Sequence, residues 1–475
     1  MSERKITTQL VVIGAGPGGY PAAFHAADLG IEVTLIDYRK YPGGVCNYEG
    51  CIPSKALLHV SKLIDEADNA SALGITYNKP VIDINSLRAW KDGVVNKLTA
   101  GLGQLSKFRK INYIQGRAEF TDSSSLSVST AEDKEIRVNF SKAVIATGSS
   151  PASVPGIEVD NNKILDSTGA LEIEEIPNKL LVIGGGYIGL ELGAVYQALG
   201  SQVSVVEMMD SLMAGVDQDL VRVLKKRLTN KFESIMLNTR VVNIENKKGK
   251  LKAQFKTKKD EIIEDVFDKV LVSVGRKPNS ENFGIENTKV TVNKRGFIEI
   301  NDQRNTSDPN IYAIGDVAGD PMLAHKATYE GKIVAEIIAG KNVLYDPNAI
   351  PAVVFTDPEI AWCGITEDGA KEQGLDYTST RFNWAASGRA TTLDRNDGLT
   401  KLIIDNKTER ILGMGIVGTG AGEMIAEGVL AIEMGATATD LKLTIHPHPT
   451  LTETVMEAAE MFFGSSTHIY KTKNN

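Results

Sequence analysis

The sequence predicts an α/β protein with two Rossmann-like dinucleotide-binding units, because one glycine-rich pattern occurs twice between short apolar strands. The first copy has an expected strand at 8–13 and a run of glycines at 14–19. An expected helix then ends at Gly30, and a second strand ends at Asp37. Such glycines let the backbone approach a pyrophosphate at the helix N-terminus, and the acidic residue accepts a hydrogen bond from a ribose hydroxyl.

The second copy begins with the apolar run 180–186. Gly184 lies 170 positions after Gly14, and Glu207 lies 170 positions after Asp37. A single glycine cluster is often only a turn, but a repeat with one internal spacing predicts two dinucleotide sites. An enzyme with two such sites is expected to pass a hydride between a flavin and a nicotinamide.

Glu207 also indicates which nicotinamide nucleotide is used. The residues that follow it are Met208, Met209 and Asp210, with no Arg or Lys. A carboxylate at this position repels the 2′-phosphate of NADP, so we expect NAD.

Length and charge narrow the class of protein further. A chain of 475 residues exceeds the roughly 250–300 residues at which one hydrophobic core stops growing, so several domains are expected. A net charge of -8 argues against nucleic acid or an anionic membrane as a partner. The amino terminus lacks a signal-peptide pattern, and no apolar run approaches the roughly 18 residues of a membrane span. We therefore expect a cytoplasmic enzyme.

Two of the three cysteines, Cys46 and Cys51, form a close pair. Proline and glycine precede Cys46, and a helical pattern runs from Ser54, so Cys51 is expected near a helix N-terminus, which favours a reactive thiolate. A zinc site would need further ligands, and Cys363 with the six histidines offers no such cluster, so no metal is expected. Two inert buried thiols remain the alternative, although the surrounding residues do not look like a core strand. Cys363 itself is expected to be a buried apolar residue.

Seven short motifs together carry a family resemblance. They are GAGPGGY at 14–20, the segment from Cys46 to Lys55, ATG at 146–148, GGGYIGLELG at 184–193, VGRKPN at 274–279, YAIGD at 312–316 and HPTLTE at 448–453. The chain thus resembles the flavin disulfide oxidoreductases from end to end, and among them those that oxidise a dihydrolipoyl group. The resemblance implies FAD and NAD as cofactors and a homodimer. One departure is Asn-Tyr-Glu at 47–49, where the family more often has Leu-Asn-Val; this changes the surroundings of the thiols and removes neither sulfur.

The same resemblance implies an order of domains. An FAD-binding domain would occupy 1–150, an NAD-binding domain 151–279, a central segment that returns to the FAD domain 280–349, and an α+β dimerisation domain 350–475. Turn-rich stretches at 149–156 and 345–351 fit two of these boundaries. The lysine-rich stretch 247–259 is expected to be an exposed hairpin. The helical pattern at 422–436 fits a dimer interface and an intramolecular core equally well.

Residue roles are carried over from the family by motif. Cys46 would exchange with substrate sulfur, Cys51 would face the flavin, and Lys55 would form an ion pair with Glu191 beside it. Without the motif these two charges would be read as solvated helix residues. The FAD site would comprise Gly14, Gly16, Gly18, Gly19, Asp37, Lys55, Thr147, Gly148 and Asp316; the NAD site would comprise Gly184, Gly186, Tyr187, Gly189, Glu207 and Gly275. Asp316 at a strand end is equally typical of a helix cap, and Tyr187 is a candidate gate of the nicotinamide pocket.

His448 is the expected acid–base residue, because a neutral imidazole accepts a thiol proton near neutral pH and a carboxylate orients it. The resemblance makes Glu453 that carboxylate and places the pair at the thiols of the partner subunit. Thr450 to Glu453 also matches a capping box, and both interpretations are compatible. His446 is expected to be structural.

The expected reaction is oxidation of protein-bound dihydrolipoamide through a Cys46–Cys51 disulfide and FAD to NAD. The partners would be lipoyl domains of 2-oxo acid dehydrogenase complexes or the glycine cleavage H protein. An NADPH-dependent disulfide reductase is disfavoured by Glu207, and a mercuric reductase by the absence of a second cysteine pair near the carboxy terminus. A transhydrogenase of this fold would lack the cysteine pair. A flavin-binding scaffold without turnover is disfavoured because the cysteines, base and lysine are all present.

Overall fold

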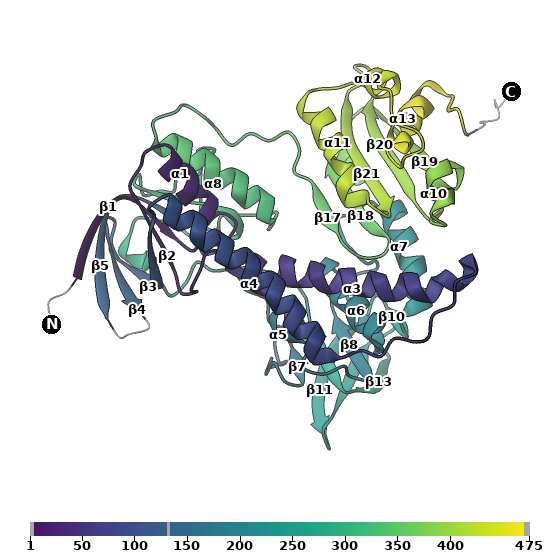
Figure 1. The fold of residues 1–475 in the computed structure, drawn as a ribbon, viewed down its shortest axis with the longest axis horizontal. Helices are drawn as coiled ribbons and strands as arrows, with labels where there is room; N and C mark the ends of the chain where they lie inside the picture. Colours follow the sequence, from purple (N-terminus) through teal and green to yellow (C-terminus); the bar gives the residue numbers. More distant parts are fainter. Residues whose placement is uncertain (1–3, 131–133, 470–475) are drawn as a thin grey trace.

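The computed structural model describes residues 4–130 and 134–469, and its strands form three main groups (Figure 1). In the view of Figure 1 the amino-terminal sheet lies to the left, a second parallel sheet lies below the centre, and the carboxy-terminal sheet lies at the upper right. The α/β fold class predicted from the sequence is confirmed.

The first sheet contains the two strands of the first glycine-rich unit, the one before the glycines and the one that ends at Asp37. Its strands are β1 (Arg4–Ile13), β2 (Val33–Asp37), β3 (Asn112–Asp122), β4 (Ser125–Thr130), β5 (Glu135–Ile145) and β16 (Ile311–Ala313). β1 lies between β2 and β5 and is parallel to both, and β16 adds in parallel beyond β5. β4 pairs antiparallel with β3 and β5. β1 starts four residues before the expected strand, at Arg4.

Helices α1 (Gly19–Asp28) and α8 (Ala324–Ile338) pack against each other on this sheet. α8 comes from a segment far along the chain, and Figure 1 shows its green ribbon beside the purple α1. Strand β1 carries Leu10, Val11 and Val12, all fully buried, as expected for a parallel strand that is covered on both faces.

The second sheet is entirely parallel, in the order β10-β9-β8-β14-β7. Its strands are β7 (Ile164–Leu165), β8 (Lys179–Ile183), β9 (Gln202–Val206), β10 (Ser234–Met236) and β14 (Lys269–Val272), with helices α5 (Ser167–Glu172), α6 (Tyr187–Leu199) and α7 (Gln218–Lys231). An antiparallel sheet of β11 (Arg240–Lys247), β12 (Lys250–Lys256) and β13 (Ile262–Phe267) follows. The lysine-rich stretch therefore forms the expected hairpin, although Leu251, Ala253 and Phe255 point into a core.

The third sheet is antiparallel, in the order β17-β18-β21-β20-β19. Its strands are β17 (Ala352–Val354), β18 (Glu359–Gly364), β19 (Tyr377–Asn383), β20 (Leu399–Asp405) and β21 (Ile411–Gly418), with helices α9 (Glu367–Glu372), α10 (Gly388–Thr392), α11 (Ala421–Glu433), α12 (Ala438–Leu443) and α13 (Glu453–Glu460). α11 packs on β18 and β21 through Met424, Ile425 and Ala431, which form part of the core. Leu430 and the following Met434 stay exposed, so the apolar pattern at 422–436 serves an intramolecular core and an open face together.

Three helices and a short two-stranded ladder connect these sheets. Short α2 (Gly44–Glu49) leads into α3 (Cys51–Asn69), and α4 (Ile84–Phe108) returns to the first sheet. β6 (Ser149–Pro151) pairs with β15 (Arg276–Pro278). Over the residues that the structure describes, every helix is too short or too polar to cross a bilayer.

Candidate active site

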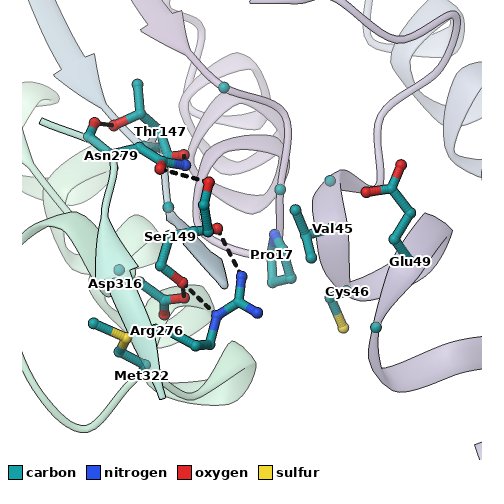
Figure 2. A pocket seen from close by; sticks show the side chains of 18 of the residues that line it. Pro17, Val45, Cys46, Glu49, Thr147, Ser149, Arg276, Asn279, Asp316 and Met322 are labelled. Carbon is teal, nitrogen blue, oxygen red and sulfur yellow. Dashed lines mark hydrogen bonds between the residues drawn. The ribbon is translucent and has the colours of Figure 1, made fainter. Parts of the chain in front are cut away.

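A cavity of about 710 Å³ lies where the amino-terminal sheet meets α2, α3 and α6. Its lining includes three glycines of the first turn, Gly14, Gly16 and Gly18, and the cysteines Cys46 and Cys51, together with residues of 276–283 and 314–327. Figure 2 shows side chains from these separate segments converging on it. The volume lies within the range of roughly 300–1,000 Å³ that is typical of sites for small molecules and cofactors.

The first glycine turn forms one wall of this cavity. Gly14 has φ +95°, and a Cβ on it would lie 2.4 Å from the carbonyl oxygen of Ala146. Gly44, with φ +58°, packs equally closely against Gly16. Gly14, Gly16 and Gly18 line the cavity, so the backbone of the turn is open to a phosphate at the start of α1, and these residues fit a dinucleotide. Gly19 does not line the cavity; a Cβ there would meet the Gly14 carbonyl oxygen at 1.8 Å, so its role is to let α1 close onto the turn.

The two acidic strand-end residues have the same local hydrogen bonds. Asp37 accepts from the backbone N–H of Ala15 at 2.7 Å and from that of Arg39 at 2.9 Å. Glu207 accepts from the backbone N–H of Gly185 at 2.6 Å and from that of Met209 at 2.7 Å. All three positions of the second set lie 170 residues after those of the first, so the duplication read from the sequence extends to individual hydrogen bonds.

The predicted NAD residues lie mainly outside the large cavity. Gly184 has φ +110°, and a Cβ on Gly189 would lie 2.4 Å from its carbonyl oxygen, which repeats the arrangement of the first turn. Gly186 and Gly275 have open space where a Cβ would point. Of the predicted NAD set only Tyr187 lines the cavity, and burial raises the pKa of its phenol to about 12, which keeps the hydroxyl protonated.

The two thiols meet at the junction of α2 and α3. Cys51 is the first residue of α3, as expected, and Cys46 lies within α2. Both are free thiols, both line the cavity, and Cys51 is open to it. The thiol of Cys46, as a hydrogen-bond donor, is the largest influence on Cys51 and, with the nearby Lys55 ammonium, lowers the pKa of Cys51 to about 7, although desolvation by the protein around the open cavity opposes this shift. The same hydrogen bond and burial raise the pKa of Cys46. One thiolate is therefore stabilised at Cys51, at the positive end of a helix.

Lys55 lies one turn further along α3 and forms an ion pair across the cavity wall. Its Nζ lies 2.9 Å from Oε2 of Glu191, a buried residue of α6. The other oxygen of Glu191 accepts from the backbone N–H of Phe355 at 2.9 Å, and Lys55 Nζ lies 4.6 Å from the centre of the Phe355 ring. The ammonium is thus fixed in position near the thiols by contacts with two separate parts of the chain, at Glu191 and Phe355.

Asp316 enters the cavity from the 3₁₀ turn Gly315–Val317 after β16. The hydroxyl of Ser149 donates to its carboxylate at 2.5 Å and accepts from Nε of Arg276 at 2.7 Å, a chain that is visible in Figure 2. The fully buried Glu330 accepts from the backbone N–H of Gly315 at 2.7 Å and so holds the turn from behind. The sequence pattern does not identify Ser149, Arg276 or Glu330 as site residues. Arg276 lies within the motif VGRKPN and Ser149 begins the turn-rich stretch 149–156, whereas Glu330 belongs to no motif.

Thr147 and Gly148 also line the cavity, and both are tied to Asn279. The Thr147 hydroxyl donates to the Asn279 carbonyl at 2.7 Å, the Asn279 side chain donates to the Thr147 carbonyl at 3.0 Å, and the Asn279 backbone N–H donates to the Gly148 carbonyl at 2.9 Å. These bonds hold the ends of β5 and β15 together above the glycine turn (Figure 2).

His448 and Glu453 form a pair elsewhere in the same chain. His448 Nδ1 lies 2.8 Å from Glu453 Oε1, and the His448 side chain is 73% exposed. Neither residue belongs to the cavity lining. Burial raises the pKa of Glu453, but hydrogen bonds from the Thr450 N–H and from His448 outweigh it and leave that pKa below its ordinary value.

The start of α13 differs from the capping box that the sequence pattern from Thr450 to Glu453 matches. The helix begins at Glu453 with Thr452 as its N-cap, and no side chain caps it. Glu453 accepts from the backbone N–H of Thr450 at 2.8 Å, which is half of such a box, while the Thr450 hydroxyl turns back to the carbonyl of Pro447. The carboxylate is therefore shared between the turn and His448.

The remaining candidates, His446 and Cys363, lie outside the cavity lining, where their contacts fit a structural role. His446 is buried between the Thr444 carbonyl and Glu427. Cys363 is buried in the carboxy-terminal core as expected, and burial raises the pKa of its thiol to about 12. The carboxylates of Asp217, Asp219 and Glu367 cluster around the ammonium of the buried Lys401, which neutralises part of their charge.

The chain belongs to the pyridine nucleotide-disulphide oxidoreductase family, whose model matches residues 8–331. The dimerisation domain of that family matches residues 350–459 and supports a homodimer. The family prediction, the enzyme class and the cofactors FAD and NAD are thereby confirmed.

Individual relatives agree with this family. The chain is 47% identical to a dihydrolipoyl dehydrogenase of Vibrio parahaemolyticus and 43% identical to that of Geobacillus stearothermophilus, in each case over 98% of both chains. Among solved structures, it is similar to the HOCl-induced flavoprotein disulfide reductase RclA of Escherichia coli, with 28% identity and a TM-score of 0.85 over 95% of this chain and 99% of that one. LpdA of Mycobacterium tuberculosis shares the fold, with 24% identity and a TM-score of 0.89 over 96% and 99% of the two chains.

Proposed function

We propose that this protein oxidises the dihydrolipoyl group to lipoyl with NAD as final electron acceptor, as the names of its curated relatives indicate. The observation that carries the proposal is the thiol pair in the cavity. Cys51, at the start of α3, has its pKa lowered to about 7, chiefly by the neighbouring thiol of Cys46, which lines the same cavity. Such a pair is suited to thiol–disulfide exchange, in which a thiolate must be available as attacking or leaving group.

The proposed FAD site is the cavity, held by residues of 1–150 and of the returning segment 280–349. NAD would bind to the second unit at 151–279, and the interface domain would be 350–475. Bound FAD would accept two electrons from the reduced thiols and supply the hydride that converts NAD⁺ to NADH. The glycine turn would face the pyrophosphate, Asp37 the adenosine ribose and Asp316 the ribitol, because these groups line the cavity at separate points.

In the substrate half-reaction the enzyme would start with Cys46 and Cys51 joined as a disulfide. His448 would take the proton of one dihydrolipoyl thiol, whose sulfur attacks Cys46 and releases Cys51 as a thiolate. The second dihydrolipoyl sulfur then displaces Cys46, so that the lipoyl disulfide leaves and two electrons and two protons remain with the enzyme. Lys55 and the helix N-terminus would stabilise the Cys51 thiolate throughout.

His448 would perform this step on the thiols of the partner subunit. This assignment is supported by the exposed position of His448 and by the fact that it does not line the cavity of its own chain. Glu453 would orient the imidazole and stabilise its charged form. The macromolecular partners would be the lipoyl domains of 2-oxo acid dehydrogenase complexes or the glycine cleavage H protein, and the compartment would be the cytoplasm.

Titration of the purified, FAD-loaded protein with dihydrolipoamide tests the proposal. We expect a long-wavelength absorbance band from a thiolate beside the flavin, followed by NADH formation when NAD⁺ is added. A protein whose flavin is reduced by NADH but never by dihydrolipoamide would contradict the proposed substrate. Peptide mapping of the oxidised protein without a Cys46–Cys51 crosslink would contradict the proposed electron path.

A further inference from the structure

The segment between the two thiols is held by a residue outside the motifs. Here the chain has Asn47, Tyr48 and Glu49, where the related family more often has Leu-Asn-Val. A carboxylate of this segment, Oε2 of Glu49, lies 3.0 Å from the guanidinium of Arg39, and the same guanidinium lies 4.7 Å from the centre of the Tyr48 ring. The two unusual residues therefore share one partner.

Arg39 is itself firmly placed. Its side chain is 7% exposed, against 35% for Glu49, and its guanidinium also donates to the hydroxyl of Tyr38. Its backbone carbonyl accepts from the hydroxyl of Tyr113 at 2.7 Å. A buried guanidinium with a carboxylate and aromatic faces around it is a rigid anchor, because the planar group can pair and stack at once.

The anchor is connected to the dinucleotide site as well as to the thiols. The backbone N–H of Arg39 donates to Asp37 at 2.9 Å, and Arg39, Asp37 and Glu49 all line the cavity that contains Cys46 and Cys51. Figure 2 shows Glu49 at the end of the short helix that carries Cys46.

The other end of this short helix is fixed against the glycine turn. The backbone N–H of Gly43 donates to the Ala15 carbonyl at 2.8 Å, and a Cβ on Gly44 would lie 2.4 Å from the Gly16 Cα. α2 is therefore held at its start by the pyrophosphate turn and at its end by Arg39. Since Cys46 lies inside α2 and Cys51 directly follows it, the placement of α2 sets how the two sulfurs meet.

We propose that Arg39 is a positioning residue that couples the adenosine end of the flavin site to the geometry of the two thiols, acting on the unusual segment 47–49. The proposal rests on the assignment of FAD to this cavity under the proposed function. The side-chain charges that shift the pKa of Cys51 are those of Lys55 and Glu191. The Arg39–Glu49 pair therefore acts by holding segment 47–49 in place and not through its charge.

Four variants and one control test this coupling. Arg39→Met removes the ion pair and keeps an unbranched side chain, Glu49→Gln removes only the carboxylate charge, and Arg39→Lys keeps the charge without the planar group. The double variant Arg39→Met with Glu49→Gln shows whether the two residues act together. Arg109→Met is the matched control, because Arg109 also pairs with a carboxylate, Asp28, and lies over a ring, Phe24, but is not part of the cavity lining.

Two quantities are measured for each purified protein. One is the dissociation constant of FAD, obtained by titrating apoprotein and following flavin fluorescence. The other is the thiolate–flavin absorbance after addition of two electron equivalents. For Arg39→Met we expect the FAD dissociation constant to rise about tenfold and the absorbance band to weaken, because α2 loses its anchor at Glu49 and only its start stays fixed on the glycine turn of the cavity. Adding Glu49→Gln to Arg39→Met should change the FAD dissociation constant and the band little further. Arg39→Lys should lie between Arg39→Met and the wild type in both quantities. Arg109→Met should match the wild type.

The proposal would be overturned if Arg39→Met and Glu49→Gln kept wild-type FAD affinity and a wild-type band, even with lowered thermal stability. Equal losses in Arg39→Met and Arg109→Met would overturn it too, since they would reflect general destabilisation. If Arg39→Met did not fold, Glu49→Gln would decide alone, because it leaves Arg39 in place. A wild-type protein that binds FAD but is not reduced by dihydrolipoamide would contradict the proposed function, while the FAD-affinity comparison would still decide the role of Arg39.

Discussion

The Ser149 hydroxyl donates to the Asp316 carboxylate at 2.5 Å while accepting from Nε of Arg276 at 2.7 Å. The hydroxyl has a single proton to donate. Because its oxygen accepts from Arg276, this proton is left for the Asp316 carboxylate. Arg276 is held in turn by the Ser149 carbonyl at 2.6 Å. The orientation of Asp316 is therefore set by residues of two other segments, Ser149 and Arg276, with the serine as the connecting group.

Ser149→Ala should weaken FAD binding. The substitution removes the only side-chain donor recorded to Asp316 among the described residues, and it leaves Arg276 Nε without its hydrogen-bond acceptor. Loss of a hydrogen bond between polar and charged groups costs about 1.5–3 kcal/mol when buried, so we expect the FAD dissociation constant to rise about tenfold. Reconstitution of apoprotein with FAD measures this. Ser127→Ala is the control, since the Ser127 hydroxyl also donates to a carboxylate, that of Glu135, but Ser127 is not part of the cavity lining; equal effects of the two variants would contradict the role of Ser149.

How far the sequence predicts this site depends on how local each feature is. The glycine turns, the acidic strand ends and the position of Cys51 at a helix start follow from neighbouring residues, and the structure contains each of them. The hydrogen bonds of Asp37 even recur at Glu207 after 170 residues, because the same short strand–turn–helix geometry is repeated.

Residue patterns within the sequence do not predict features that join distant segments. Ser149 and Arg276 are 127 positions apart, and Glu330 reaches Gly315 only because α8 packs behind the first sheet. Lys55 and Glu191, 136 positions apart, were paired by family resemblance alone. No periodicity or spacing in one sequence reports such contacts, since they depend on how the sheets and helices meet.

Cys46→Ala and Cys46→Ser should separate the two ways in which Cys46 acts on Cys51. The pKa of Cys51 is lowered to about 7 chiefly by the hydrogen bond from Cys46. The alanine variant removes that donor, so the pKa of Cys51 should rise and its thiolate should require higher pH. The serine variant retains a hydroxyl donor and should keep a pKa closer to that of the reduced wild type.

The measurement is the pH dependence of the thiolate–flavin absorbance, or of the alkylation rate of Cys51. For the reduced wild type the thiolate should be present above about pH 7 and lost below it, because a lowered thiol pKa keeps the charged form at lower pH. Cys51→Ser should abolish the band and lipoamide turnover while FAD stays bound. An alanine variant that titrates like the serine variant would show that the hydrogen bond is unimportant.

Lys55→Met and Glu191→Gln should shift the same titration in opposite directions. The Lys55 ammonium lowers the pKa of Cys51 and the Glu191 carboxylate raises it. Lys55→Met should therefore move the Cys51 titration to higher pH, whereas Glu191→Gln should move it to lower pH. Shifts of the same sign in both variants would mean that the pair acts on the cysteine through structure and not through charge.

His448→Gln should lower dihydrolipoamide oxidation by about 10²–10⁴-fold, the usual contribution of a positioned acid–base group. Reduction of an artificial quinone acceptor by NADH should remain close to wild type, because that reaction requires no thiol proton transfer. Glu453→Gln should give a smaller loss, since His448 would keep a hydrogen-bond partner but lose the carboxylate charge. Equal losses in the dihydrolipoamide and quinone assays of His448→Gln would indicate a defect in the flavin site.

Glu207 should determine the choice between NAD and NADP. Its carboxylate accepts from the backbone N–H groups of Gly185 and Met209; with NAD bound to the second unit as proposed, this negative charge would face the 2′-phosphate of NADP. The wild type should form NADH with a kcat/KM at least about tenfold above that for NADPH, since one unfavourable charge contact near the protein surface is worth more than 1.4 kcal/mol. Glu207→Gln keeps one acceptor oxygen for the turn and removes the charge, so it should reduce this preference mainly through KM. Unchanged discrimination in Glu207→Gln, or NADPH formation by the wild type as efficient as NADH formation, would assign the specificity to other residues of the second unit.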